Sequence, residues 1–163
     1  MWQPIPLQGT ADRLDHRLLW PLQRLCESAL MADIFVFGSN LAGRHGAGAA
    51  ATAKLMYGAK PGNGVGMAGQ SYAIPTKSYA IKTLPLHVIQ GFVTGFLEHA
   101  RATPENLYVV TRIGCGLAGY KDSEIAPMFT GAPSNCVFDP AWSAFGLPAW
   151  ATPPYGFQPK GCK

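Results

Sequence analysis

The sequence predicts an α/β domain in which a largely parallel sheet carries helices on both faces. Segments typical of buried strands alternate with segments typical of helices, and this alternation is characteristic of parallel sheets. Three glycine-rich segments follow or precede the predicted strand ends. Ligands of such sheets bind beyond the carboxyl ends of the strands. The fold class therefore directs the search for a functional site to the glycine-rich loops.

The first predicted strand covers residues 34–37, which are four consecutive apolar residues with high β-propensity. A run without alternation indicates a strand buried on both faces, so we expect it near the centre of the sheet. Residues 38–48 form the first glycine-rich loop. The alanine-rich segment 49–57 then predicts a helix that ends at Gly58.

A second glycine-rich loop, residues 61–69, leads into a short predicted strand, residues 71–74, which ends at Pro75. Pro85 suits the first turn of the next helix. Apolar residues then recur at helical spacing, which predicts an amphipathic helix. They are Ile89, Phe92, Val93, Phe96, Leu97 and Ala100.

The third strand is predicted over residues 107–111 and is followed by the third glycine-rich loop, residues 113–120. Asp122 or Ser123 is expected to cap a short helix that runs through Phe129 despite an internal proline. Residues 136–138 predict the last strand.

We expect three parts along the chain. Residues 1–30 contain leucines at helical spacing and form an appended segment, residues 31–140 form the main domain, and residues 141–163 form an irregular tail. The tail is rich in proline and aromatic residues. Its aromatic side chains either pack on the domain, which we favour, or cover the edge of a pocket; they are Trp142, Trp150 and Tyr155.

Composition narrows the class of protein. Charged residues make up 13% of the 163 residues and hydrophobic residues 48%, so wholesale disorder is not expected. The chain has neither an apolar run of the ~20 residues that cross a bilayer nor the start of a signal peptide, which predicts a cytoplasmic protein. It has no Lys/Arg-rich run for nucleic acid. The cysteines are too scattered for a zinc motif or a disulfide framework; they are Cys26, Cys115, Cys136 and Cys162.

The distribution of charge points to an anionic ligand. No Asp or Glu occurs from Ile34 to Leu97, whereas this stretch contains basic side chains such as Arg44 and Lys77. A carboxylate-bound Mg²⁺ or Ca²⁺ and a glycosidase carboxylate pair are therefore excluded from it. An anion would meet no repulsion there. The alternative interpretation is a plain polar, glycine-rich surface.

Two segments, residues 46–51 and 64–69, match the G-x-G-x-x-G/A pattern. The second leads into a strand and the first is not followed by the ribose-binding carboxylate, so a Rossmann dehydrogenase is not expected. Backbone N–H groups at a helix N-terminus still favour a phosphate, because glycine leaves no side chain to block its approach. The loop with Gly114, Gly116 and Gly119 offers a second row of amides, which suggests a diphosphate between the two loops.

The motifs resemble those of the macro domain family. Residues 36–40 and 46–50 resemble its strand, its ribose-binding asparagine and its first phosphate loop. Residues 71–77 resemble the following strand, and residues 111–120 the second phosphate loop. The similarity runs in order over about residues 33–140, and it is closest to a divergent branch common in phages and bacteria.

The resemblance implies a three-layer α/β/α fold with a mostly parallel mixed sheet that binds ADP-ribose or a related nucleotide without a metal or cofactor. Many family members hydrolyse ADP-ribose 1″-phosphate or ADP-ribosyl esters. The implied ligand-binding residues come from the two loops and the first strand. They are Gly38, Ser39, Asn40, Arg44, Gly46, Ala47, Gly48, Gly114, Cys115, Gly116, Leu117, Ala118, Gly119 and Tyr120.

The chain departs from the family in the residues that recognise adenine and in those that carry out hydrolysis. The Asp-Ile element that reads adenine in the family has no counterpart, because Asp33 abuts the first strand. Ala49 and Ala50 occupy the positions of the aspartate that the commonest hydrolases use. A metal-free hydrolase would therefore depend on His45, the one side chain of the first loop that exchanges a proton near neutral pH, together with Asn40 at the distal ribose.

Several alternatives stay open at this point. His45 is either catalytic or a solvent-exposed loop histidine, and Asn40 either contacts the ligand or holds a turn. Cys115 is either a nucleophile activated by loop amides or, as we favour, a packed thiol. Lys77 faces either ligand or solvent. The alternatives to an enzyme are a non-catalytic binder of a nucleotide signal and a phage structural or interaction protein.

Overall fold

The computed structural model describes residues 33–158. The helical segment expected over residues 1–30 lies outside this part of the chain, as do residues 159–163. Among the helices that are described, none has the length and the apolar character needed to cross a bilayer.

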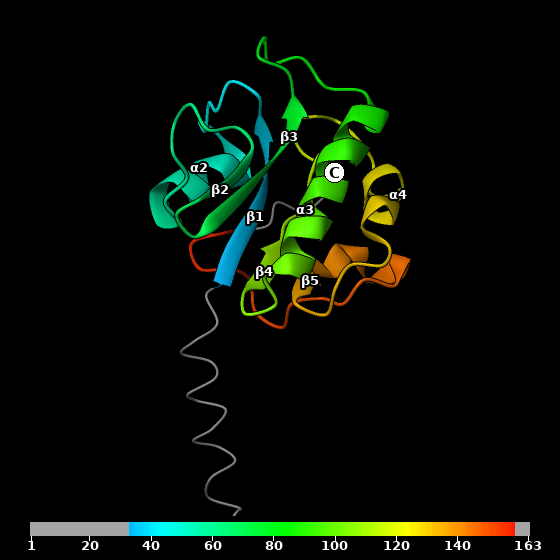
Figure 1. Cartoon of the computed structure of the whole chain (residues 1–163). Helices are drawn as coiled ribbons and strands as arrows, with labels where there is room; N and C mark the ends of the chain where they lie inside the picture. The colour runs from blue at the N-terminus through cyan, green and yellow to red at the C-terminus, as the bar shows by residue number, and fades with distance from the viewer. Residues whose placement is uncertain (1–32, 159–163) are drawn as a thin grey trace, which may run out of the picture. The chain divides into compact units, whose positions relative to one another are not determined.

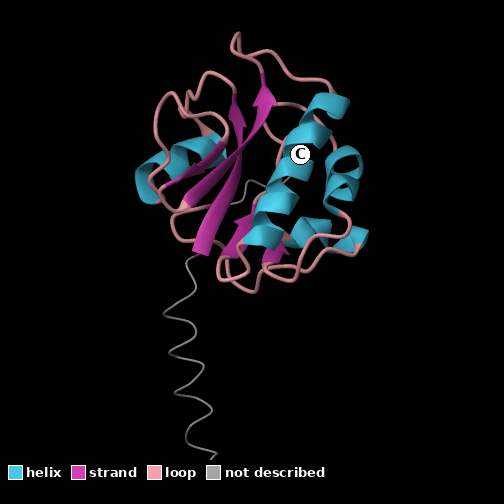
Figure 2. Ribbon diagram, in the orientation of Figure 1, coloured by secondary structure: helices cyan, strands magenta, loops and turns pink. Residues whose placement is uncertain are grey.

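The domain is built on a mixed sheet of five strands in the order β2-β3-β1-β4-β5, and Figures 1 and 2 show it with its helices. The strands are β1 (Asp33–Asn40), β2 (Gly66–Ala68), β3 (Ser71–Lys77), β4 (Leu107–Val110) and β5 (Cys136–Phe138). All neighbours pair in parallel except β2, which is antiparallel to β3. The predicted α/β class and the largely parallel sheet are confirmed.

Strand β1 occupies the centre of the sheet, as its uninterrupted apolar run predicts. Its side chains alternate between two hydrophobic clusters. Ile34 and Val36 pack with α3 (Leu86–Ala102), whereas Phe35 and Phe37 pack with α2 (Gly48–Met56). Helices therefore cover both faces of the sheet.

The α3 side holds the larger cluster. Ile89, Val93 and Phe96 of α3 are fully buried, which confirms the amphipathic pattern. The helix expected over residues 122–129 divides into α4 (Asp122–Ile125) and a 3-10 helix, η1 (Ala126–Phe129). Pro127 stands in η1, where a proline is tolerated better than in the interior of an α-helix.

Two local predictions need correction around β3. This strand continues through Pro75 to Lys77. Pro75 is accommodated because β2 pairs with β3 only as far as Ala73, so the missing N–H is not required on that side. The loop expected over residues 61–69 contains β2, a short strand that the glycine-rich sequence conceals.

The tail is more ordered than expected. Residues Pro140–Phe145 form a second 3-10 helix, η2, and the Asp139 side chain caps its N-terminus. Trp142 is fully buried and Trp150 nearly so, which confirms that these aromatic residues pack on the domain, whereas Tyr155 remains 79% exposed.

Candidate functional site

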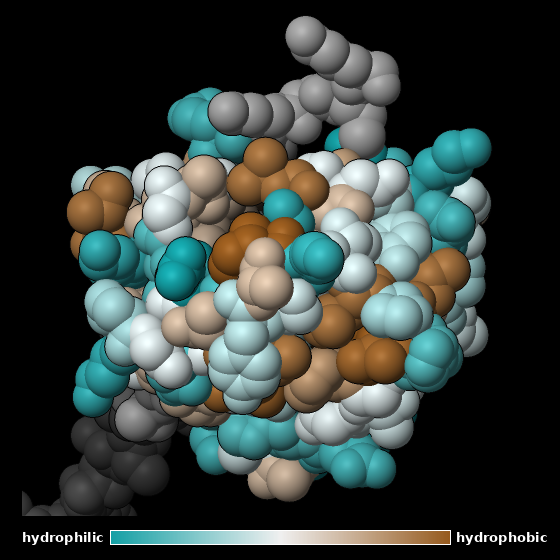
Figure 3. Space-filling model, turned by 90° about the horizontal axis from the view of Figure 1, so that it is seen from above, coloured by the Kyte–Doolittle hydropathy of each residue, from teal (hydrophilic) through white to brown (hydrophobic). Residues whose placement is uncertain are grey.

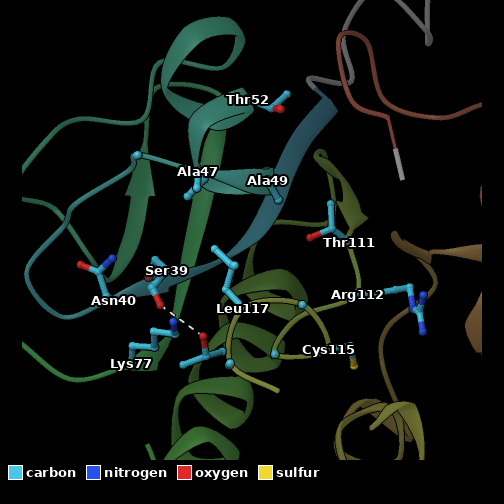
Figure 4. A pocket seen from close by; sticks show the side chains of 18 of the residues that line it. Ser39, Asn40, Ala47, Ala49, Thr52, Lys77, Thr111, Arg112, Cys115 and Leu117 are labelled. Carbon is cyan, nitrogen blue, oxygen red and sulfur yellow. Dashed lines mark hydrogen bonds between the residues drawn. The ribbon is translucent and has the colours of Figure 1, made fainter. Parts of the chain in front are cut away.

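A pocket of about 980 Å³ opens where β1 and β4 end. These two strands are neighbours, but the chain leaves β1 toward β3 on one side and later returns to β4 on the other. Such a change of direction creates the crevice in which open α/β sheets bind ligands. Figure 4 shows loops from both strand ends facing this space.

The first wall of the pocket is the N-terminus of α2. Ala47, Gly48, Ala49 and Ala50 line the pocket together with Gly46. Ala47 is extended, and no side chain caps the helix or places a negative charge in its first turn. The first N–H groups of a helix have no intrahelical partner and carry the positive end of the dipole. This wall is therefore suited to an anion.

Glycine is needed at position 48 for backbone reasons. Gly48 has φ +59, in the left-handed region that other residues avoid. An added Cβ would meet no atom within 4 Å. A side chain at this position would thus project into open space at the pocket rather than into the protein.

The second wall is the loop that follows β4. Thr111, Arg112 and residues 114–118 line the pocket. Four amides of the loop are used internally. The Ile113 amide donates to the Thr111 carbonyl, and those of Cys115, Gly119 and Tyr120 donate to carbonyl oxygens of Arg112, Gly116 and Gly114. Among the loop residues that line the pocket, the Cys115 amide is therefore already engaged within the loop.

Two of the expected ligand-binding residues lie outside the pocket wall. Gly119 and Tyr120 belong to the turn that closes the third glycine-rich loop, and the Tyr120 hydroxyl donates to the Leu84 carbonyl at 2.6 Å. This hydrogen bond of Tyr120 connects the loop to the segment before α3. The other twelve expected binding residues all line the pocket.

Three basic side chains of the described residues line the pocket, and that of Arg112 belongs to an ion pair. Arg44 and Lys77 line the pocket from the first loop and from the end of β3. The Arg112 guanidinium forms an ion pair with Asp122 on α4. The Trp142 indole also donates to this carboxylate, at 2.7 Å. The pairing links the segment after β4 to α4 and η2.

The state of Asp122 reflects this network. Burial raises the pKa of its carboxyl group, but the hydrogen bonds from Arg112 and Trp142, with a smaller one from Cys115, outweigh burial. The net effect lowers the pKa of Asp122. The ion pair is therefore a persistent part of the pocket wall near neutral pH.

Asn40 holds the first loop. Its amide nitrogen donates to the Arg44 carbonyl at 2.7 Å, and its amide oxygen accepts from the Arg44 N–H at 2.9 Å. These bonds match the turn-holding alternative. Asn40 also lines the pocket, and the second proton of its amide nitrogen remains for a ligand.

His45 is not positioned for catalysis in this pocket. The ring is 5% exposed, packs edge-on against Phe37, and is absent from the pocket wall. Its Nε2 lies 3.2 Å from the Lys60 carbonyl and 3.1 Å from the Asn63 carbonyl. Because both partners are acceptors, Nε2 carries a proton and donates. The ring therefore connects the first glycine-rich loop to the segment at residues 60–63. Neither a solvent-exposed histidine nor a catalytic one in this pocket fits this position.

The second glycine-rich loop supports the site without lining it. Gly64 lies so close to the end of β1 that an added Cβ would stand 2.0 Å from the Asn40 carbonyl oxygen. The Ser39 hydroxyl donates to the Gly64 carbonyl. The first and third glycine-rich loops line the pocket, whereas the second does not.

Sequence patterns alone do not identify several residues of the wall. They are Thr52, Thr76, Ile81, Asp139, Gly156, Phe157 and Gln158. Asp139 directly follows β5, and this place at a strand end is the one sequence feature that points to its position in the pocket wall. Ile81 has φ +62, a backbone strain that no local sequence signal indicates.

The rim of the pocket is partly apolar. Leu117 is 72% exposed and Ile81 37% exposed, and both line the pocket. Figure 3, which views the domain from the carboxyl ends of the strands, shows apolar surface interspersed with hydrophilic side chains. The opening therefore combines apolar contact area with polar and basic groups.

Neither family models, nor curated protein sequences, nor solved structures gave a match to this chain. The function is therefore inferred from the pocket itself.

Proposed function

We propose that the chain binds ADP-ribose or a related nucleotide, with the diphosphate held between the loop at residues 46–49 and the loop at residues 114–118. The observation that carries this proposal is the uncapped N-terminus of α2 opposite a second glycine-rich loop in one pocket. Both supply backbone amides, which bind phosphate oxygens without a metal ion. Arg44 and Lys77 add positive charge to the same wall.

The sequence resemblance to macro domains supports the same ligand class. The motifs that carry it, residues 36–40, 46–50 and 111–120, contribute most of the pocket wall. The mixed sheet with helices on both faces is compatible with the three-layer macro-like fold that the resemblance implies. The proposed domain is the macro-like region over residues 31–140.

The geometry favours binding over hydrolysis that depends on His45. The imidazole is engaged with backbone carbonyls and lies outside the wall, so it cannot exchange a proton with a ligand held there. Asn40 retains one amide proton for the ligand, which suits a positioning role at the sugar. We therefore propose a nucleotide-binding protein.

Titration calorimetry with ADP-ribose tests this proposal. The variant Gly48→Asp adds a negative charge beside the diphosphate, whereas Gly48→Asn adds a neutral side chain of the same size at the same backbone conformation. Loss of charge-assisted hydrogen bonds worth about 3 kcal/mol weakens binding by roughly 100-fold. We expect this loss in Gly48→Asp and a distinctly smaller one in Gly48→Asn.

Equal affinities of the two variants would show that no anion approaches the α2 N-terminus. Absence of ADP-ribose binding by the wild-type chain would refute the proposal directly. Folding of both variants is checked by their thermal melting.

A further inference from the structure

Ile81 holds a backbone conformation that its residue type disfavours. Its φ is +62, in the left-handed region, where the branched Cβ of isoleucine crowds the backbone. Every other described residue with a positive φ is a glycine, and there are eleven of these. At those positions the chain uses the residue that adopts the conformation without strain. Ile81 is therefore an exception within this protein.

The conformation comes from a tight turn in the hairpin at residues 77–83, between β3 and α3. The Ser78 N–H donates to the Lys82 carbonyl at 2.8 Å, and the Ile81 N–H donates to the Ser78 carbonyl at 3.0 Å. Residues 79–81 thus form a three-residue loop. In such loops a turn is followed by one left-handed residue, and this position usually carries glycine. Glycine would therefore fit the backbone better than Ile81 does.

The hydrophobic core does not explain the isoleucine. Ile81 is 37% exposed and belongs to neither of the two clusters that pack on the sheet. It lines the pocket instead. Strained backbone conformations gather at active sites and ligand clamps, where the side chain serves a function. The place of Ile81 in the pocket wall thus supplies a reason for the isoleucine that the fold does not.

A second exposed apolar side chain accompanies Ile81 at this part of the pocket. Leu117 of the third glycine-rich loop is 72% exposed and also lines the pocket. The hairpin is attached to this loop, because the Thr83 hydroxyl donates to the Ala118 carbonyl at 3.1 Å. Ile81 and Leu117, which we call the apolar rim, are therefore held where the hairpin meets the loop. Both are accessible to a ligand.

The apolar rim lies at the sugar end of the proposed site. Asn40 pairs with Lys77 in the register of β1 and β3, and the Leu41 N–H donates to the Lys77 carbonyl at 2.9 Å. The hairpin therefore begins beside Asn40, the residue proposed to position the sugar. A ligand that continues past its second phosphate toward Asn40 brings its next carbon atoms to the apolar rim.

Building on the proposed function, we propose that Ile81, together with Leu117, determines which nucleotides bind: the apolar rim favours diphosphates that carry a carbon-containing group beyond the second phosphate. ADP-ribose and ADP-glucose belong to this class, whereas ADP ends in a charged phosphate that loses hydration beside apolar side chains. Apolar contact is non-directional and does not read single hydroxyl groups. The rim therefore selects the class rather than one sugar.

Two variants of Ile81 in the full-length chain test the proposal by thermal melting and titration calorimetry. Ile81→Gly removes both the side chain and the strain, and Ile81→Asn keeps a side chain that tolerates the left-handed region but is polar. We expect both variants to melt about 2–4 °C above the wild type. Both should lose roughly 10-fold in affinity for ADP-ribose and ADP-glucose, with the affinity for ADP unchanged. A purely structural role would not combine higher stability with a selective loss of binding.

The exposed leucine of the rim gives a second test with a matched control. Leu117→Ala should weaken the binding of ADP-ribose and ADP-glucose by roughly 5-fold and leave the melting temperature unchanged. Leu55→Ala removes a leucine that is 79% exposed on α2 and lies outside the pocket wall. This control should bind all three nucleotides as the wild type does. The leucine pair suffices if the Ile81 variants do not fold.

The wild type should bind ADP-ribose and ADP-glucose at least 10-fold more tightly than ADP. Equal affinities for ADP-ribose and ADP would refute the selection while leaving nucleotide binding intact. Binding of ADP-ribose without ADP-glucose would also overturn it, because the site would then read one sugar. A lower melting temperature with unchanged affinities in Ile81→Gly would assign Ile81 to the fold alone. Absence of binding of all three nucleotides would refute both this proposal and the proposed function.

Discussion

Replacing Gly64 with alanine should strongly destabilise the domain. Among the described glycines whose φ is not positive, we expect this glycine-to-alanine substitution to cost the most stability. The added Cβ would lie 2.0 Å from the Asn40 carbonyl oxygen, 3.0 Å from the Asn40 carbonyl carbon and 3.1 Å from the Gly43 nitrogen. All three are backbone atoms, so no side-chain rotation relieves the overlap. The loop at residues 61–65 must move away from the end of β1.

The size of the effect follows from the contacts that this movement breaks. Overpacking in a close-packed region costs about 1–3 kcal/mol. Separation of the loops also weakens the hydrogen bond from Ser39 to the Gly64 carbonyl and that from His45 to the Asn63 carbonyl, each worth about 1 kcal/mol. The total is about 3–5 kcal/mol, which lowers the melting temperature by roughly 6–20 °C.

Differential scanning calorimetry of Gly64→Ala against Gly91→Ala measures this effect. Gly91 is exposed on α3, and an added Cβ there meets no atom within 4 Å. The control should gain about 0.5–1 kcal/mol from better helix propensity. A Gly64→Ala protein that melts within 2 °C of the wild type would refute the inferred close approach of the two loops.

Two further predictions concern titratable groups. The pKa of Asp122 is lowered in the folded state. The ionised carboxylate therefore stabilises the fold at pH values above its ordinary pKa near 4, and this stabilisation is lost as the pH falls through the lowered pKa. Asp122→Asn should therefore make the melting temperature depend less on pH below 4; an unchanged acid dependence would contradict this. Burial raises the pKa of the Cys136 thiol to about 12, so alkylation at pH 8 should spare Cys136 until guanidinium unfolds the chain. Peptide mass spectrometry reports this, and rapid modification of native Cys136 would argue against its burial.

Those elements of the fold that depend on local patterns could be predicted from the sequence. The apolar run at residues 34–37 indicated the central strand, and the periodicity of residues 89–100 indicated α3. By contrast, β2 has only three residues, including Gly66, and depends on pairing with β3 for its existence. Tertiary pairing overrides its poor β-propensity.

The candidate site divides in the same way. The two phosphate-binding loops could be proposed because glycines at strand ends are a local signal. The position of His45 could not, since its burial depends on carbonyl groups 15 and 18 residues away in the chain. Asp139 and Phe157 enter the pocket wall through the packing of the tail, which no periodicity describes.

A crystal structure of the chain with bound ADP-ribose would test the central claim most directly. We predict diphosphate oxygens within hydrogen-bonding distance of backbone amides in both residues 46–49 and residues 114–118. Density for the ligand outside the pocket, or in the pocket with its diphosphate away from the α2 N-terminus, would contradict the account.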